Sequence, residues 1–222
     1  MSLNDIFFSI VYEFKRKIRY LLLKKHDLSL VTNNCIGGKL AHDFGLRLNS
    51  PTVNLQMTPE DFVKFCYHLD VYLSMELQEV KQVDKVCSDK FKNVGGDEIS
   101  FPVAKLGDIH LFLQHYDTFE SAVECWKRRV SRLNKSNCYF ILVTKYEGHI
   151  KAVNDFLVLP KKNKLLLIID SIPEEFDMGK EIFCLHVPQG IHFMDRVDGQ
   201  LHYYYDKFPF LKWFNGKNIL SN

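Results

Sequence analysis

The chain has 222 residues, and 46% of them are hydrophobic, which suits one sizeable domain with a real core and excludes a disordered chain. Its 29 basic and 27 acidic residues leave a net charge of +2, so no general nucleic-acid binder is expected. The six cysteines contain no C-x-x-C pair, which argues against a zinc knuckle or a disulfide framework, and no cofactor is predicted. Without a visible signal peptide or an apolar run of about 20 residues, we expect a cytoplasmic location.

The first segment, Ser2 to Lys25, predicts an amphipathic helix, which we treat as an N-terminal element of residues 1–26 in front of a single domain of residues 27–222. Its apolar residues recur at helical spacing: Leu3, Ile6, Phe7, Ile10, Phe14, Ile18 and Leu21. Basic residues crowd its second half: Lys15, Arg16, Lys17, Arg19, Lys24 and Lys25. The helix either docks on the domain with a solvated basic face or lies peripherally on an anionic membrane surface.

The next stretch, Leu28 to Gly45, predicts a buried strand that turns into a short helix from Lys39 to Phe44. Cys35 then lies just before a helix N-terminus, where unpaired N–H groups can lower the pKa of a thiol and hold an oxyanion. The alternative is a small buried residue that packs the turn. After it, Thr58 is predicted to cap a helix with a continuous apolar stripe as far as Leu73. The charged residues that follow, up to Asp97, predict a short strand or helix and an exposed loop.

A strand over Ile109 to Gln114 and a helix over Phe119 to Leu133 enclose a second polar turn. His115 therefore follows the carboxyl end of a strand, as Cys35 does. If the two strands are parallel neighbours, the two side chains converge at one edge of the sheet. Asp117 either orients His115 or caps the helix.

The helix after this turn carries a basic face, Lys127, Arg128, Arg129 and Arg132. Arginine binds phosphate or carboxylate through two parallel hydrogen bonds, so a phosphate-bearing ligand such as a nucleotide sugar or lipid phosphate fits this face. A solvated face near the helix C-terminus explains the same residues without a ligand.

Strands over residues 139–144, 165–170 and 182–187 and a helix over residues 149–157 complete an alternating pattern. This pattern predicts a three-layer α/β domain with a mixed, largely parallel sheet and helices on both faces. The last segment, residues 197–222, is rich in aromatic residues and is expected to pack back on the domain.

Several of these motifs together carry a family resemblance: the run Asn33 to Gly38, Gly45-Leu46, Asn49-Ser50-Pro51, Thr58 to Phe62, His115-Tyr116, Trp126 to Arg129 and Arg132 to Asn134. From about Asp27 to Asn215 the chain resembles the bacterial family called domain of unknown function 1919, whose members are often labelled exopolysaccharide biosynthesis proteins. The resemblance implies an α/β fold and a surface-polysaccharide or capsule setting, without an established activity. Relatives usually carry an aromatic residue where this chain has Ile36. A looser similarity links the pattern to a family proposed to be papain-like cysteine peptidases.

Two functional hypotheses follow. In the first, Cys35 is a nucleophile, His115 its base, Asp117 or Asn34 the group that orients the histidine, and the turn amides the oxyanion hole of an acyl or glycan transferase or hydrolase. In the second, the protein is a non-catalytic accessory that binds a sugar, phosphosugar or lipid-linked glycan. The predicted ligand-binding residues are Asn33, Gly37, Gly38, Arg128, Arg129 and Arg132. No metal site and no nucleic-acid partner is predicted.

Overall fold

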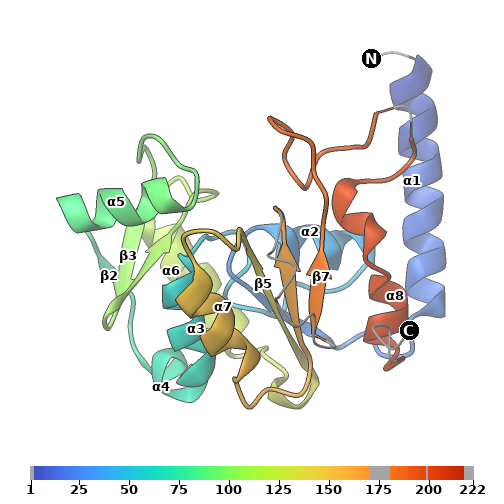
Figure 1. Cartoon of the computed structure of the whole chain (residues 1–222). Helices are drawn as coiled ribbons and strands as arrows, with labels where there is room; N and C mark the ends of the chain where they lie inside the picture. Colours follow the sequence, from blue (N-terminus) through green and yellow to red (C-terminus); the bar gives the residue numbers. More distant parts are fainter. Residues whose placement is uncertain (1–2, 171–180, 199, 218–222) are drawn as a thin grey trace.

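A computed structural model describes residues 3–170, 181–198 and 200–217, and its centre is a four-stranded parallel sheet (Figure 1). The strand order is β1-β5-β6-β7, and every neighbouring pair is parallel. The strands are β1 (Ser29–Thr32), β5 (Cys138–Thr144), β6 (Lys164–Ile168) and β7 (Ile182–Cys184). Each matches a strand predicted from a continuous apolar run, because strands covered on both faces need apolar side chains on both sides.

Helices cover both faces of this sheet, so the predicted three-layer α/β architecture is confirmed. Alternate residues of β5 enter two different cores: Phe140 and Leu142 face one side, whereas Tyr139 and Ile141 face the other. The first core is closed by α3 (Pro59–Tyr67), α6 (Phe119–Val130) and α7 (Ile150–Leu157). The second core is closed by α2 (Ile36–Asp43) and α8 (Phe210–Phe214), with α1 (Leu3–Leu22) outside them.

A second, antiparallel sheet lies beside the first, with the strand order β2-β3-β4. Its strands are β2 (Gln78–Glu79), β3 (Val103–Leu106) and β4 (Ile109–Phe112). The strand predicted to carry His115 is β4, and it is not a parallel neighbour of β1 as the convergence argument required. Helix α5 (Lys85–Asn93) packs on this small sheet through Cys87 and Phe91.

Two further helix predictions need correction or completion. The apolar stripe after Thr58 is divided at His68, where α3 ends and α4 (Leu69–Ser74) begins. The backbone of His68 has φ −106° and ψ 38°, outside helical values, so the single predicted helix is two short ones. A short 3₁₀ turn, η1 (Lys135–Asn137), leads into β5.

The aromatic C-terminal segment packs back on the domain, as predicted. It contains the 3₁₀ turn η2 (Tyr204–Lys207) and α8, and its rings enter the same core as Tyr139. Tyr205, Phe208, Phe210 and Phe214 are all buried. The predicted tail also includes residues 218–222, and the predicted N-terminal helix residue 2; these lie outside the described residues.

Candidate active site

The turn that carries Cys35 is held by short local hydrogen bonds. The side chain of Asn34 accepts the N–H of Ile36 at 3.1 Å, and the hydroxyl of Thr32 donates to the carbonyl of Asn34 at 2.7 Å. Helix α2 consequently begins at Ile36, three residues earlier than the sequence predicted, with Cys35 as its N-cap residue. Ile36 is fully buried, so an aliphatic side chain fills this position without difficulty.

Gly37 brings the first turn of α2 into close contact with β1. A methyl group on Gly37 would lie 2.6 Å from the hydroxyl oxygen of Thr32, which leaves no room for a side chain. The N–H of Lys39 donates to the carbonyl of Cys35 at 3.2 Å. Gly37 and Gly38 come before Lys39, so the carbonyl groups of the helix offer their N–H groups no acceptor. Asn34 accepts the N–H of Ile36, so in the described part of the chain the N–H groups of Gly37 and Gly38 are the donors in this first turn that have no backbone acceptor.

Cys35 and His115 meet: the Sγ of Cys35 lies 3.0 Å from the Nε2 of His115. The segment between Val53 and Met57 brings them together by joining the two sheets. The N–H of Met57 donates to the carbonyl of Asn33 at 2.8 Å. One residue earlier, Gln56 exchanges two backbone hydrogen bonds of 2.9 Å with Phe112 at the end of β4. The histidine therefore reaches the cysteine across this connection between sheets rather than from a neighbouring strand.

Arg129 fixes the turn that follows His115. Its buried guanidinium group donates to the carbonyl of Val53 at 2.8 Å and to the hydroxyl of Tyr116 at 2.5 Å. Arg129 was predicted as a ligand-binding residue; in the structure its two contacts tie the turn after His115 to the connecting segment.

The environment of Cys35 differs from the sequence expectation. Burial raises the pKa of the Cys35 thiol, whereas the position before a helix was expected to lower it. Burial therefore favours the neutral thiol at Cys35.

Among the described residues, neither of the two residues predicted to orient His115 contacts it. Asp117 is exposed, and among the described residues it has no hydrogen bond or ion pair with His115. The cap of α6 is Thr118, whose hydroxyl accepts the N–H of Ser121 at 3.2 Å, so Asp117 does not serve as the cap either. Asn34 binds Ile36, as described above.

Asn33 lies in the interior, where it links the ends of two strands. Its side-chain amide donates to the carbonyl of Val143 and accepts the N–H of the same residue, both at 2.9 Å. These contacts use its oxygen and one amide hydrogen within the fold, so its contribution to the site is to hold β1 against β5.

A cluster of arginines lies on and beside α6. Arg128 is exposed and donates to the sulfur of Cys125 at 3.0 Å. Partial burial and the nearby guanidinium groups of Arg47, Arg128 and Arg129 lower the pKa of Arg132. Mutual repulsion of this kind marks a local excess of positive charge, and an anionic group would relieve it. Sequence reasoning missed Arg47 because it lies far from α6 along the chain.

In the part of the chain that the structure describes, no group of three or more His, Cys, Asp and Glu side chains has the geometry to hold a metal ion. Likewise, none of the described helices is both long and apolar enough to cross a bilayer.

Comparison with known proteins gives a family and a relative. A protein of Haemophilus influenzae described as an uncharacterized protein is 29% identical over 201 residues, which cover 87% of this chain and 86% of the relative. The family model described as "Domain of unknown function (DUF1919)" matches residues 7–215. The match includes both turns of the candidate site and nearly the whole described fold. The chain therefore belongs to the DUF1919 family.

Proposed function

We propose that this protein is a cysteine-dependent acyl or glycan-ester transferase or hydrolase with Cys35 as nucleophile and His115 as general base. The observation that supports this proposal is the 3.0 Å contact between the two side chains at the N-terminus of α2. A thiol and an imidazole at this distance can exchange a proton directly.

The proposed reaction has two steps. His115 Nε2 accepts the thiol proton while Sγ attacks the carbonyl carbon, and the carbonyl oxygen becomes an oxyanion near the N–H groups of Gly37 and Gly38. The oxyanion then collapses, the bond to the leaving alcohol or amine breaks, and His115 returns the proton to that group. The resulting thioester is cleaved by water or an acceptor alcohol, whose proton passes to His115 and then to the released thiol.

The arginines on and beside α6 support a substrate that carries an anionic group. Arg47, Arg128 and Arg132 would bind a phosphate or carboxylate on the molecule that carries the reacting carbonyl. An acylated phosphosugar or lipid-linked glycan meets this description. We also propose that the protein acts in the assembly of a surface polysaccharide, as the family resemblance implies. A cytoplasmic location is proposed from the sequence, in which no signal peptide is visible.

A second candidate function uses the same arginines without chemistry. In it the protein is an accessory that binds a phosphosugar or nucleotide sugar, and Cys35 has no covalent role. The excess positive charge around Arg132 favours this candidate independently of the cysteine.

Alkylation of Cys35 by iodoacetamide, followed by peptide mass spectrometry between pH 6 and 9.5, tests the proposal. We expect modification of Cys35 at pH 7 at least about tenfold faster than in His115→Ala, because loss of the base leaves a thiol whose pKa is raised by burial. Cys125, which is partly exposed and has no histidine partner among the described residues, is the internal control and should react equally in both proteins.

Trapping with an activated acetyl ester completes the experiment. A thioester on Cys35 that is absent in Cys35→Ser and His115→Ala supports catalysis. Equal alkylation of Cys35 in the native protein and His115→Ala, without a thioester, would reject it and leave ligand binding as the remaining candidate.

A further inference from the structure

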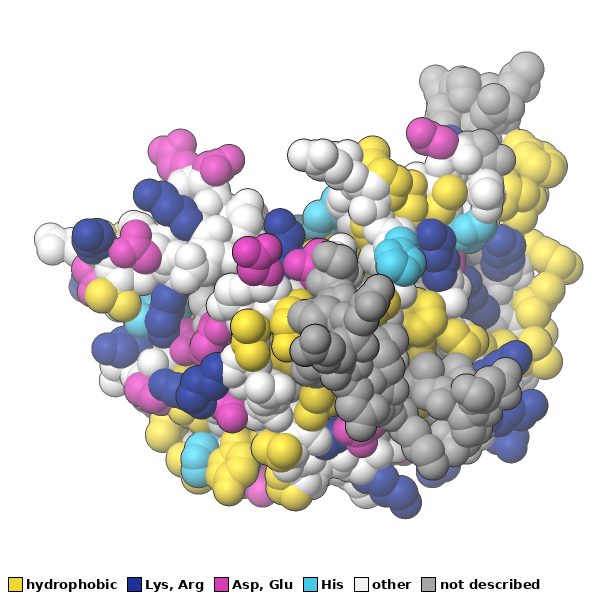
Figure 2. All heavy atoms as spheres, viewed as in Figure 1, with side chains coloured by type: hydrophobic (Ala, Val, Ile, Leu, Met, Phe, Trp, Pro, Cys, Tyr) yellow, Lys and Arg dark blue, Asp and Glu magenta, His cyan; other side chains and the backbone are white. Residues whose placement is uncertain are grey.

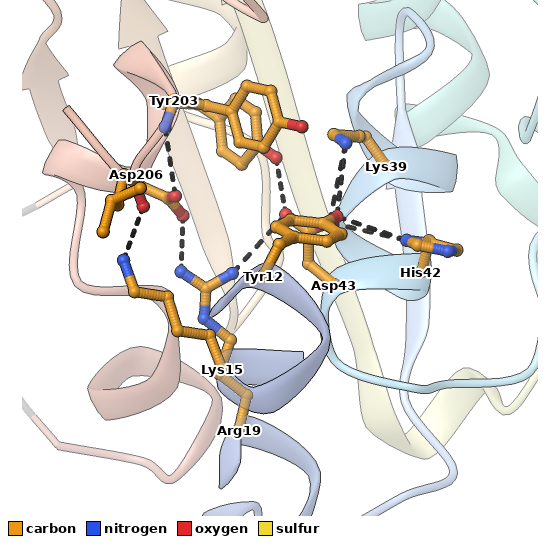
Figure 3. A network of polar contacts seen from close by, with 10 residues as sticks. Tyr12, Lys15, Arg19, Lys39, His42, Asp43, Tyr203 and Asp206 are labelled. Carbon is orange, nitrogen blue, oxygen red and sulfur yellow. Dashed lines mark hydrogen bonds and ion pairs between the residues drawn. The ribbon is translucent and has the colours of Figure 1, made fainter. Parts of the chain in front are cut away.

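Helix α1 is attached to the domain by its polar side chains. Figure 3 shows Tyr12 and Arg19 pointing from α1 towards the buried carboxylate of Asp43 on α2. Arg19 lies 3.5 Å from Asp43 and 2.7 Å from Asp206. Lys39 lies over the ring of Tyr203, 4.1 Å from its centroid. The inner face of this amphipathic helix therefore carries its polar side chains, together with Phe8, whose ring lies 5.9 Å from that of Tyr203, whereas ordinary docking buries the apolar face.

The apolar face of α1 points to solvent. Phe7 is 59% exposed, Ile10 and Phe14 are both 64% exposed, and Leu21 is 78% exposed. These positions follow one another at spacings of three, four and seven residues and form one stripe, which we call the outer ridge. In Figure 2 hydrophobic side chains follow the edge of the molecule that α1 forms in Figure 1. Other exposed apolar residues, such as Val86 on α5 and Val158 after α7, are not part of a comparable stripe.

Positive charge accompanies the outer ridge. Lys17 lies next to it on the helix, and Lys24 and Lys25 follow the helix end; all three are exposed. Among the described residues, none of these three ammonium groups forms an ion pair, whereas Arg16 is paired with Glu13 at 3.0 Å. An apolar stripe bordered by free lysines matches the acyl chains and negative headgroups of an anionic bilayer surface. A second copy of the chain, docked through the same ridge, would bring its own basic helix against this one, so that like charges would face each other.

We infer that α1 lies in the interface of an anionic phospholipid membrane through its outer ridge, and that the polar contacts on its other face hold the domain at that surface. The twenty residues of α1 make a helix about 30 Å long, which lies along the membrane and does not cross it. Because α1 packs against α2, the helix that follows Cys35, the attachment fixes the orientation of the candidate site relative to the membrane. The inference depends on the outer ridge and holds whether or not Cys35 is catalytic.

Vesicle sedimentation with the full chain tests it. The probes are phosphatidylcholine vesicles with and without 30% phosphatidylglycerol, at about 0.1 M and 0.5 M salt. We expect binding to the anionic vesicles and at least about tenfold weaker binding at high salt or without the anionic lipid. Ile10→Ser combined with Phe14→Ser should abolish it, and Lys17→Glu combined with Lys24→Glu should weaken it. Val86→Ser combined with Val158→Ser is the control: it also replaces two exposed apolar side chains by serine, but away from α1, and this variant should bind as the native protein does.

Urea unfolding curves show whether a variant is still folded, and light scattering shows whether the chain forms a dimer. The outer-ridge side chains are exposed, so the double serine variant should unfold at the same urea concentration as the native protein. If the native chain does not bind, or if the double serine variant binds equally well, the inference is wrong. A dimer that the double serine variant converts to a monomer would identify a second copy as the occupant and would also overturn it.

Discussion

Arg129 donates a hydrogen bond to the hydroxyl of Tyr116 from inside the protein, and the residue before Tyr116 is the histidine that contacts Cys35. The same guanidinium group binds the carbonyl of Val53 in the segment that joins the two sheets. The position of the proposed base thus depends on an arginine that does not touch the cysteine.

Arg129→Lys tests this dependence. An ammonium group cannot reproduce the planar arrangement of donors, so the carbonyl of Val53 or the hydroxyl of Tyr116 loses its partner. We expect a loss of about 1–3 kcal/mol in the free energy of unfolding, measured in urea, together with slower alkylation of Cys35 at pH 7. Arg128→Lys is the matched control on the exposed side of the same helix and should leave both quantities unchanged. If the alkylation rate of Arg129→Lys equals that of the native protein, Arg129 does not position His115.

Gly37→Ala tests the close approach of α2 to β1. The added methyl group would lie 2.6 Å from Thr32 Oγ1 and 3.3 Å from the carbonyl oxygen of Leu30, so the helix must move. We expect a loss of about 1–3 kcal/mol, although alanine favours the helix by about 1 kcal/mol. Thermal unfolding of Gly38→Ala provides the comparison, because its nearest contacts are side-chain atoms at 3.2 and 3.3 Å. An equal melting temperature for both variants would contradict the steric argument.

The pair formed by His149 and Glu60 predicts a pH dependence of stability. Its Nδ1 and Oε1 atoms lie 2.8 Å apart, and the hydrogen bond to Glu60 raises the pKa of His149. Burial opposes ionisation of Glu60, but the contacts with His149 outweigh it and lower the pKa of Glu60. The contribution of the histidine is therefore complete below its ordinary pKa of 6.5 and is lost as the pH rises through the raised value.

The corresponding experiment compares the native protein with His149→Gln in urea at several pH values. The stability difference between them should be largest between about pH 5 and 6.5 and should shrink towards pH 8.5. It should also shrink below pH 4.5, the ordinary pKa of Glu60, as that carboxylate is protonated. His186→Gln, at an exposed histidine whose backbone carbonyl alone accepts a hydrogen bond among the described residues, serves as the control. A difference that grows between pH 6.5 and 8.5 would have the wrong sign and would contradict the assignment.

The contacts of Asp43 allow a prediction of what happens when the attachment of α1 to the domain is weakened. Its buried carboxylate accepts hydrogen bonds from Tyr12 and Tyr205, and the burial of these phenols, together with the charge of Asp43, raises the pKa of both. Asp43→Asn removes the charge that faces Arg19, and we expect a loss of about 2–4 kcal/mol in urea unfolding. Faster proteolysis within α1 should accompany it. Asp198→Asn, at an exposed position, should change neither measurement.

The sequence predicted the parallel sheet well because β5 and β6 are short apolar runs, which are typical of parallel strands covered on both faces. It also identified the two turns that carry Cys35 and His115. It could not predict why they meet. The pairing of Gln56 with Phe112 depends on backbone hydrogen bonds between residues 56 positions apart, and almost every residue carries the same backbone groups, so the sequence does not show which of them pair. The inverted docking of α1 was missed for a related reason: helical periodicity shows that two faces exist but not which one meets the domain.

Because of the connection through Gln56, the contact between Cys35 and His115 depends on both sheets. Cys35 follows β1 of the parallel sheet and His115 follows β4 of the antiparallel one, and the backbone pair of Gln56 and Phe112 joins them. A thiol without a nearby base is a weak nucleophile at neutral pH. In the proposed mechanism, the reactivity of Cys35 therefore reports on the assembly of the two sheets as well as on the chemistry of the site.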